Sequence, residues 1–291
     1  MVYNADTVAN DGISEDIVVY LYGARYTPLA IKAEYLGGSM YYDIAVLSVS
    51  ESELLKDSDA VAATVADSEG VRVGDQAVAV GNPKGAGLSA SFGIVSVDTE
   101  QIAMLVGNTQ YVSMRVMRID TAVNSGNSGG GLYNAAGDLC GIVNAKVVSE
   151  DVENIGYAIP SNLAIAVAQN IVDHCDGVNT LRVKQVNLGI QIGLRDSYAE
   201  MDQDEGYMKI VQRVVVSAMD TDSLANGILQ VDDEIVSMTL DSRTVAVTRL
   251  HHVTDLLLDV RAGDTLTFTI KRDSTQMTKS ITISETNMVE Y

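Results

Sequence analysis

The chain is poor in histidine, cysteine and positive charge. Among its 291 residues there are three histidines and two cysteines, and 39 acidic residues outweigh 19 lysines and arginines, which gives a net charge of −20. This charge argues against nucleic acid or an anionic membrane surface as the main partner, because either would repel the protein. We expect the acidity to serve solubility.

Long apolar runs are also missing. No run approaches the roughly 20 residues that a membrane-spanning helix needs, and the polar and acidic residues after Met1 do not form a signal peptide. A chain without its natural N-terminus would look the same, so these absences leave the localisation open. Apolar residues still make up 47% of the sequence, which excludes a disordered chain and suffices for about two domains.

The metal-binding residue types predict no metal site and no cofactor. Cys140 lies in an apolar run that predicts a buried strand, and Cys175 lies near the end of a predicted helix. We expect both cysteines to be free, and no cysteine–histidine cluster has metal-ligand spacing. The acidic run 202–206 resembles a calcium loop only loosely, because no glutamate follows at the required spacing. A solvated loop is the expectation there.

The first half of the chain favours β structure. Short apolar runs between glycines and polar turns predict strands over residues 17–21, 44–49, 77–80, 93–97, 112–119 and 139–145. Many short strands with turn signals are typical of a β-barrel or a sandwich. A helix is predicted over 163–174, with Ser161 or Asn162 as its N-terminal cap and His174 near its end.

A polar linker over 176–183 separates this pattern from a second one. The second pattern predicts strands over 190–194, 209–216, 265–271 and 278–284, a short helix near 223–226 and a longer helix around 250–260. We therefore expect two domains, residues 1–176 and residues 184–291.

The stretch Gly126-Asn127-Ser128-Gly129-Gly130 carries the clearest chemical signal. A serine hydroxyl becomes a good nucleophile when a base takes its proton and hydrogen-bond donors stabilise the oxyanion that forms. The glycines leave the amides of Gly126 and Ser128 unshielded for that task. The stretch also fits the elbow of α/β-hydrolases, but that elbow needs a helix after the serine, and here a strand and hairpin follow. On this motif alone, a glycine-rich structural turn remains an alternative.

Five segments in order resemble the HtrA/Deg family of trypsin-like serine proteases, which carry a C-terminal PDZ domain. They are residues 42–47, with Asp43-Ile44-Ala45-Val46-Leu47, and residues 73–83, 93–96, 120–130 and 156–162. The resemblance implies a mainly β fold, in which a chymotrypsin-like double β-barrel with an incomplete first barrel precedes an α+β PDZ domain. It also implies an endopeptidase of protein quality control that acts on misfolded or extracytoplasmic proteins.

The same resemblance assigns roles to residues. It implies Ser-His-Asp acyl transfer with Ser128 as the nucleophile, Asp43 as the triad acid, and the amides of Gly126 and Ser128 as the oxyanion hole. It implies that one strand flanks the specificity pocket and pairs with the substrate backbone. This strand comprises Val143, Asn144, Ala145 and Lys146.

The sequence departs from the family at the histidine. The family places it a few dozen residues before the aspartate, whereas His174, His251 and His252 all follow Ser128. Residues 1–5 resemble what comes after that histidine, so we expect a truncated gene product that is inactive as it stands. A second departure is Gly131, where the family usually has proline; this glycine predicts a looser backbone after the nucleophile.

In the second half the resemblance implies a peptide-docking groove. Leu188-Gly189-Ile190 matches the loop whose amides capture a C-terminal carboxylate, and the helix around 250–260 walls a groove in which a peptide adds a strand. The implied partners are unfolded proteins or peptides, C-terminal peptides at this groove, and two further copies in a homotrimer when N-terminal segments are present. An extracytoplasmic location follows from the same resemblance. A non-catalytic peptide-binding protein, or a remnant without activity, is the alternative.

Overall fold

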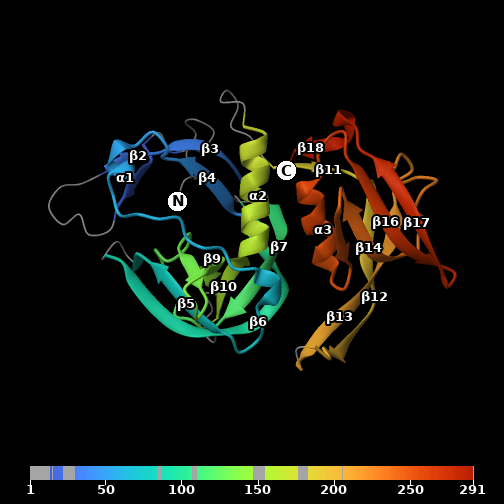
Figure 1. The fold of residues 1–291 in the computed structure, drawn as a ribbon, viewed down its shortest axis with the longest axis horizontal. Helices are drawn as coiled ribbons and strands as arrows, with labels where there is room; N and C mark the ends of the chain where they lie inside the picture. The colour runs from blue at the N-terminus through green and yellow to red at the C-terminus, as the bar shows by residue number, and fades with distance from the viewer. Residues whose placement is uncertain are drawn as a thin grey trace. The chain divides into compact units, whose positions relative to one another are not determined.

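The computed structural model describes residues 14, 16–21, 30–83, 87–106, 110–146, 155–175, 183–204 and 206–290. The chain is mainly β, as predicted, and divides into two compact units, Met1–Arg182 and Val183–Tyr291 (Figure 1). Among the described residues, no helix is long and apolar enough to cross a membrane.

The first unit is built around a closed β-barrel with the strand order β10-β7-β6-β5-β8-β9. Alternating side chains of these strands point inward, and Met117, Ile119 and Leu132 are fully buried in the core. The strands are β5 (Gln76–Gly81), β6 (Ser89–Val106), β7 (Gln110–Ile119), β8 (Gly131–Tyr133), β9 (Leu139–Lys146) and β10 (Gly156–Pro160).

Two hairpin sheets precede the barrel. Strand β1 (Val18–Tyr20) pairs with β2 (Ala30–Lys32), and β3 (Glu34–Ser39) pairs with β4 (Ile44–Ser48). The short helix α1 (Glu53–Lys56) follows, and its N-cap Ser52 accepts a hydrogen bond from the Leu55 amide. The segment then enters the barrel through the 3-10 turn Ser68–Gly70.

Helix α2 (Ser161–Asp173) packs against β3, β4 and β9, and its end at His174 agrees with the sequence prediction. The predicted cap is wrong, because the helix begins at Ser161 itself and Pro160 is its N-cap. The Ser161 hydroxyl donates to the Ala66 carbonyl at 2.8 Å, and the Asn162 side chain accepts from the Ser68 amide at 3.0 Å. Both side chains therefore tie the helix to a neighbouring segment.

The second unit is a twisted sheet covered by one helix. Its strand order is β12-β13-β14-β16-β17, with β15 paired to β14, while β11 pairs with β18. Helix α3 (Leu250–Asp259) packs against β12, β13 and β14 and buries Val253, Leu256 and Leu258. The strands are β11 (Lys184–Val186), β12 (Ile190–Met201), β13 (Met208–Met219), β14 (Glu234–Leu240), β15 (Arg243–Ala246), β16 (Thr265–Arg272), β17 (Thr275–Thr282) and β18 (Met288–Glu290).

Two predictions for this unit need correction. The short helix expected near 223–226 is a pair of turns, in which the Ser223 hydroxyl donates to the Leu188 carbonyl at 2.7 Å and accepts from the Ala225 amide at 3.1 Å. Such side-chain bonds to the backbone compete with helix formation. Strand β12 is also longer than the predicted 190–194, because its polar outer part pairs with β13. Strand β13 exceeds its predicted range 209–216 mainly at its inner end, where Ala218 and Met219 pair with the start of β12.

Candidate active site

Ser128 lies in a tight loop between β7 and β8. Gly126 and Gly129, on either side of it, have φ angles of +101° and +84°, which side chains with a Cβ rarely adopt. Asn127 donates its amide to the Asn124 carbonyl, and Gly130 donates its amide to the Asn127 carbonyl, each at 2.9 Å. The glycines therefore shape the loop that presents Ser128, which is exposed.

Strand β9 fixes this loop from one side. The Gly129 amide donates to the Val143 carbonyl at 2.7 Å, and the Val143 amide donates to the Gly130 carbonyl at 2.8 Å. On its other side Gly130 lies so close to β5 that a Cβ atom would come within 2.2 Å of the Val80 carbonyl oxygen. The position directly after Ser128-Gly129 thus admits glycine and no larger residue without a shift of the backbone.

The two amides expected to form the oxyanion hole are available. In the described part of the chain, neither the Gly126 amide nor the Ser128 amide donates to another protein group. Backbone amides that are held in place without a protein acceptor can bind an anion without breaking an existing bond. The local backbone is therefore compatible with oxyanion stabilisation next to the Ser128 hydroxyl.

Asn127, between these two amides, is buried and holds the loop against β5. Its Nδ2 donates to the Ala122 carbonyl at 3.5 Å, and its Oδ1 is buried without a hydrogen-bond partner. A Cβ atom on Gly81 would lie 2.6 Å from that Oδ1, so Gly81 makes room for the asparagine side chain. No local sequence pattern predicts this contact.

The sequence predicted a looser backbone at Gly131, but in the structure this residue is paired on both sides within the barrel. Gly131 is the first residue of β8 and pairs with Val80 on one side and Ile142 on the other. A Cβ atom at this position would lie 2.6 Å from the Tyr133 ring. The glycine leaves space for that ring, and the barrel holds its backbone.

Asp43 occupies the turn that joins β3 to β4, with a φ of +52°. The Asn144 side-chain amide donates to Asp43 Oδ2 at 2.5 Å, and it also contacts the Met114 sulfur at 3.4 Å. Although Asp43 is exposed as a whole residue, desolvation of its carboxyl raises its pKa, and the Asn144 hydrogen bond opposes that rise. Asn144 is itself buried.

Two neighbouring residues of β9 connect Asp43 to the Ser128 loop. Val143 pairs with Gly129 and Gly130, and Asn144, the next residue, binds the Asp43 carboxylate. Asn144 was expected to flank the substrate pocket; its contact with Asp43 was not foreseen. Of Ala145 and Lys146, the structure describes the backbone only, as the continuation of β9.

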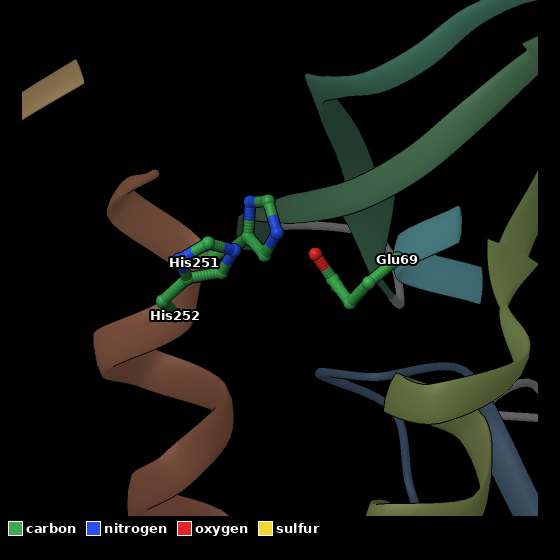
Figure 2. Close-up of side chains that lie close together, drawn as sticks. All are labelled: Glu69, His251 and His252. Carbon is green, nitrogen blue, oxygen red and sulfur yellow. The ribbon is translucent and has the colours of Figure 1, made fainter. Parts of the chain in front are cut away.

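The three histidines have other local partners. His174 ends α2, and its Nδ1 lies 2.7 Å from the Asn170 carbonyl oxygen. His251 and His252 project from α3, where their rings meet edge to face with centroids 4.6 Å apart (Figure 2). His252 Nδ1 also lies 2.9 Å from the Ala246 carbonyl oxygen.

The loop expected to capture a carboxylate already forms hydrogen bonds within the protein. Gly189 has a φ of +67°, and a Cβ atom there would lie 2.7 Å from Ser223 Cα. Its amide donates to Asn187 Oδ1 at 2.8 Å, and its carbonyl accepts from the Asp220 amide at 2.9 Å. A bound carboxylate would therefore have to replace the Asn187 side chain at the Gly189 amide. Leu188 is buried, and Ile190 begins β12.

Comparisons with known proteins decide the family. The family model of the trypsin-like peptidase domain matches residues 4–142. Serine endoprotease DegS of Escherichia coli (strain K12) is 30% identical over 283 residues, which cover 96% of this chain and 72% of DegS. The chain belongs to the HtrA/Deg family of serine proteases.

Other relatives agree with this assignment. Serine protease Do-like HtrA of Bacillus subtilis (strain 168) is 30% identical over 270 residues, or 89% of this chain, and the match spans 56% of that protein's length. The solved structure of the HtrA-type protease AlgW with a tripeptide superposes with a TM-score of 0.59 at 28% identity, covering 94% of this chain and 82% of that one. The HtrA/Deg chain thus has the expected mainly β, chymotrypsin-like fold.

The Asp43 carboxyl gives a first prediction. Because its pKa is raised, the protonated form is favoured by folding, and this contribution is present at about pH 4 and lost as the pH rises through the raised pKa. Asp43→Asn keeps an acceptor for Asn144 and tolerates a positive φ. We expect this variant to gain stability relative to the wild type between about pH 4 and pH 7, measured as the midpoint of urea unfolding. A stability difference between the variant and the wild type that stays constant over that pH range would contradict the prediction. Asp43→Ala, which removes the acceptor for Asn144, should be less stable than the wild type at about pH 4 and at about pH 7.

The close approach of Gly130 to Val80 gives a second prediction. Gly130→Ala should destabilise the first unit by about 1–3 kcal/mol, because the new methyl group overlaps a backbone oxygen that strand pairing holds in place. Gly70→Ala is the matched control, since a Cβ atom at Gly70 meets nothing within 4 Å. Urea unfolding of both variants tests this, and equal stability of the two would show that the loop yields easily.

Proposed function

We propose that this chain carries the nucleophile and the acid of an HtrA/Deg endopeptidase, with Ser128 and Asp43 in these roles. The observation that supports this most is the pairing of consecutive residues on β9: Val143 holds the Ser128 loop and Asn144 holds the Asp43 carboxylate. The proposed substrates are unfolded proteins or peptides, in keeping with the peptide-bound AlgW structure. A location outside the cytoplasm is proposed from the relative named periplasmic pH-dependent serine endoprotease DegQ, of Escherichia coli (strain K12).

In the proposed reaction, Ser128 Oγ attacks the carbon of a peptide carbonyl while an imidazole takes its proton. The carbonyl electrons move onto the oxygen, where the amides of Gly126 and Ser128 stabilise the negative charge. The imidazolium then returns the proton to the leaving nitrogen as the C–N bond breaks, and water releases the acyl group by the same steps. Asp43 orients the ring and stabilises its positive charge.

The missing element in this scheme is the imidazole. The chain's histidines are His174, His251 and His252, none of which precedes Asp43 in the sequence, and His174 is engaged at the end of α2. We propose that these 291 residues alone react slowly, with roughly the 10³–10⁴-fold acceleration that remains when a triad member is removed. A histidine supplied from an upstream segment would restore the triad.

Chemical rescue tests this scheme. A fluorophosphonate probe should label Ser128 slowly in the 291-residue chain, and added free imidazole should accelerate labelling by at least about tenfold, because it can act as the general base. The Asp43→Asn variant, which should fold, should lose most of this acceleration. The measurement is the rate of labelling across a series of imidazole concentrations.

Two controls make the result decisive. Ser128→Ala should abolish labelling, and the His174→Ala variant should leave the rescue unchanged. Fast labelling without imidazole would disprove the proposed inactivity. Absence of labelling at any imidazole concentration would disprove Ser128 as the nucleophile.

One observation favours a second function, non-catalytic binding of peptides by the second unit. Strand β12 ends its sheet, and α3 packs beside it, which is the arrangement in which an added peptide strand can bind. In this proposal the loop of Leu188, Gly189 and Ile190 receives the C-terminal carboxylate. The protein would then hold unfolded chains whether or not Ser128 reacts.

The affinities of one peptide with a free C-terminus and with an amidated C-terminus test whether the loop binds a carboxylate. If the loop captures a carboxylate, amidation of the C-terminus should weaken binding to the Ser128→Ala chain by about tenfold or more, because charge-assisted hydrogen bonds are lost. Fluorescence anisotropy of labelled peptides measures both affinities. Equal affinities would contradict carboxylate capture at this loop.

A further inference from the structure

Asn144 is a polar residue among apolar ones. Cys140 and Val143 on the same strand, β9, are 1% exposed, and Asn144 is 6% exposed. A buried amide group costs free energy unless its donors and its acceptor find partners. An apolar residue of similar size would avoid this cost, so packing alone does not account for an asparagine at this position.

The orientation of the Asn144 amide follows from its neighbours. An asparagine amide has two N–H donors and one carbonyl acceptor. Nδ2 lies 2.5 Å from Asp43 Oδ2 and 3.4 Å from Met114 Sδ, so both donors have an acceptor, although the sulfur is a weak one. The opposite orientation would place the amide oxygen against the carboxylate, where two acceptors repel each other. The amide therefore faces Asp43 as a donor, and its oxygen is left buried without a partner.

The bond from Asn144 occupies one oxygen of the Asp43 carboxylate. Among the described residues it is the only hydrogen bond or ion pair of this side chain, so Oδ1 has no protein partner there. Without this bond, no described group would keep the carboxylate from rotating about its Cβ–Cγ bond. Asn144 thus fixes one oxygen and leaves the other available in a defined direction, which is what an acid that orients an imidazole ring needs.

The same bond favours the charged form of Asp43. Burial raises the pKa of this carboxyl by desolvation, and the hydrogen bond from Asn144 lowers it. Among the described residues, no charged side chain contributes to the shift. The titratable residues of the β3–β4 hairpin and of α2, which packs against it, are Glu34, Tyr35, Tyr41 and Tyr42, and Asp173 with His174 at the helix end. Without Asn144, desolvation would act unopposed and favour the protonated acid.

We propose that Asn144 is a positioning residue of the reaction. Its amide holds Asp43 Oδ2 and thereby presents Oδ1, in the ionised state, to the imidazole that takes the proton of Ser128. Asn144 acts through Asp43 and touches neither the ring nor the reacting atoms. This role rests on the proposed endopeptidase function, in which Asp43 orients the imidazole.

Asn144→Leu removes the donor and keeps an apolar side chain of similar size. The measurement is the imidazole-rescued labelling of Ser128 by the fluorophosphonate probe, expressed per neutral imidazole so that the titration of imidazole itself does not contribute. At about pH 7 the rescue should fall at least about tenfold, because a hydrogen bond to a charged group is lost. Its decline on the acid side should move to higher pH, because the cause that lowers the pKa of Asp43 is gone.

Asn144→Asp has the same shape and reverses the expected pH dependence. Two carboxyl groups at this distance share one proton at acid pH, and the pKa at which the pair loses that proton is raised. With the shared proton, the substituted side chain still donates to Asp43; without it, the two carboxylates repel each other. The rescue of this variant should therefore fall as the pH rises, whereas the rescue of the unchanged chain rises as Asp43 ionises.

Met114→Leu is the matched control, because it alters the packing around the same amide and leaves the bond to Asp43 in place. It should keep the rescue and the pH dependence of the unchanged chain. Urea unfolding checks that each variant is folded, and Asn144→Asp, which keeps the bond at acid pH, decides the question if Asn144→Leu does not fold.

Three outcomes would overturn the proposal. Rescue of the two Asn144 variants that equals that of the unchanged chain would exclude the positioning role, while Ser128 and Asp43 keep theirs. A loss of the same size at every pH in both variants would show that Asn144 serves structure alone. If the unchanged chain shows no rescue, the proposed function and this role are both wrong.

Discussion

The candidate active site depends on strand β9 more than on any other element. Within two residues this strand forms two backbone hydrogen bonds to the Ser128 loop and one side-chain hydrogen bond to the Asp43 carboxylate. Asp43 comes from a hairpin outside the closed barrel and Ser128 from a loop of the barrel, so nothing in their own elements brings them together. β9 pairs with β10 and β8 in the closed barrel, so the same strand completes the barrel and contacts both candidate site residues.

Two buried side-chain oxygens near the candidate active site lack a hydrogen-bond partner. In the described part of the chain, Asn127 Oδ1 and Asn144 Oδ1 are among the few buried side-chain atoms without a hydrogen-bond partner. Leaving such a group unsatisfied costs about 1–3 kcal/mol, and native proteins usually avoid it. Both residues adjoin the proposed chemistry, one between the oxyanion amides and one on the Asp43 carboxylate.

The sequence was most informative where backbone conformation and pattern alone determine structure. Strands β5, β7 and β9, α2 and the glycine loop around Ser128 were predictable, because strand alternation, helical periodicity and positive φ each leave a local signature. Strand β10 was not predicted, and β6 extends well beyond the predicted 93–97. The contact between Asn144 and Asp43 was not, since it joins residues from distant elements and an asparagine in a strand predicts no particular partner. The same reason explains the failed helix cap, because Ser161 and Asn162 bind the segment at Ala66 and Ser68, and no local pattern records that neighbour.

The full length of β12 was not predicted for a related reason, and this length leaves an open strand edge. Residues beyond Leu194 are mostly polar and lack a buried face, so their pairing with β13 leaves little trace in the hydrophobic pattern. An unpaired strand edge invites association, and proteins protect such edges with bulges and charge. Here the register shifts lie near the inner end of β12, and the acidic residues lie along its outer end. The bulges and the charged side chains of β12 are therefore the features that protect this edge from pairing with another strand.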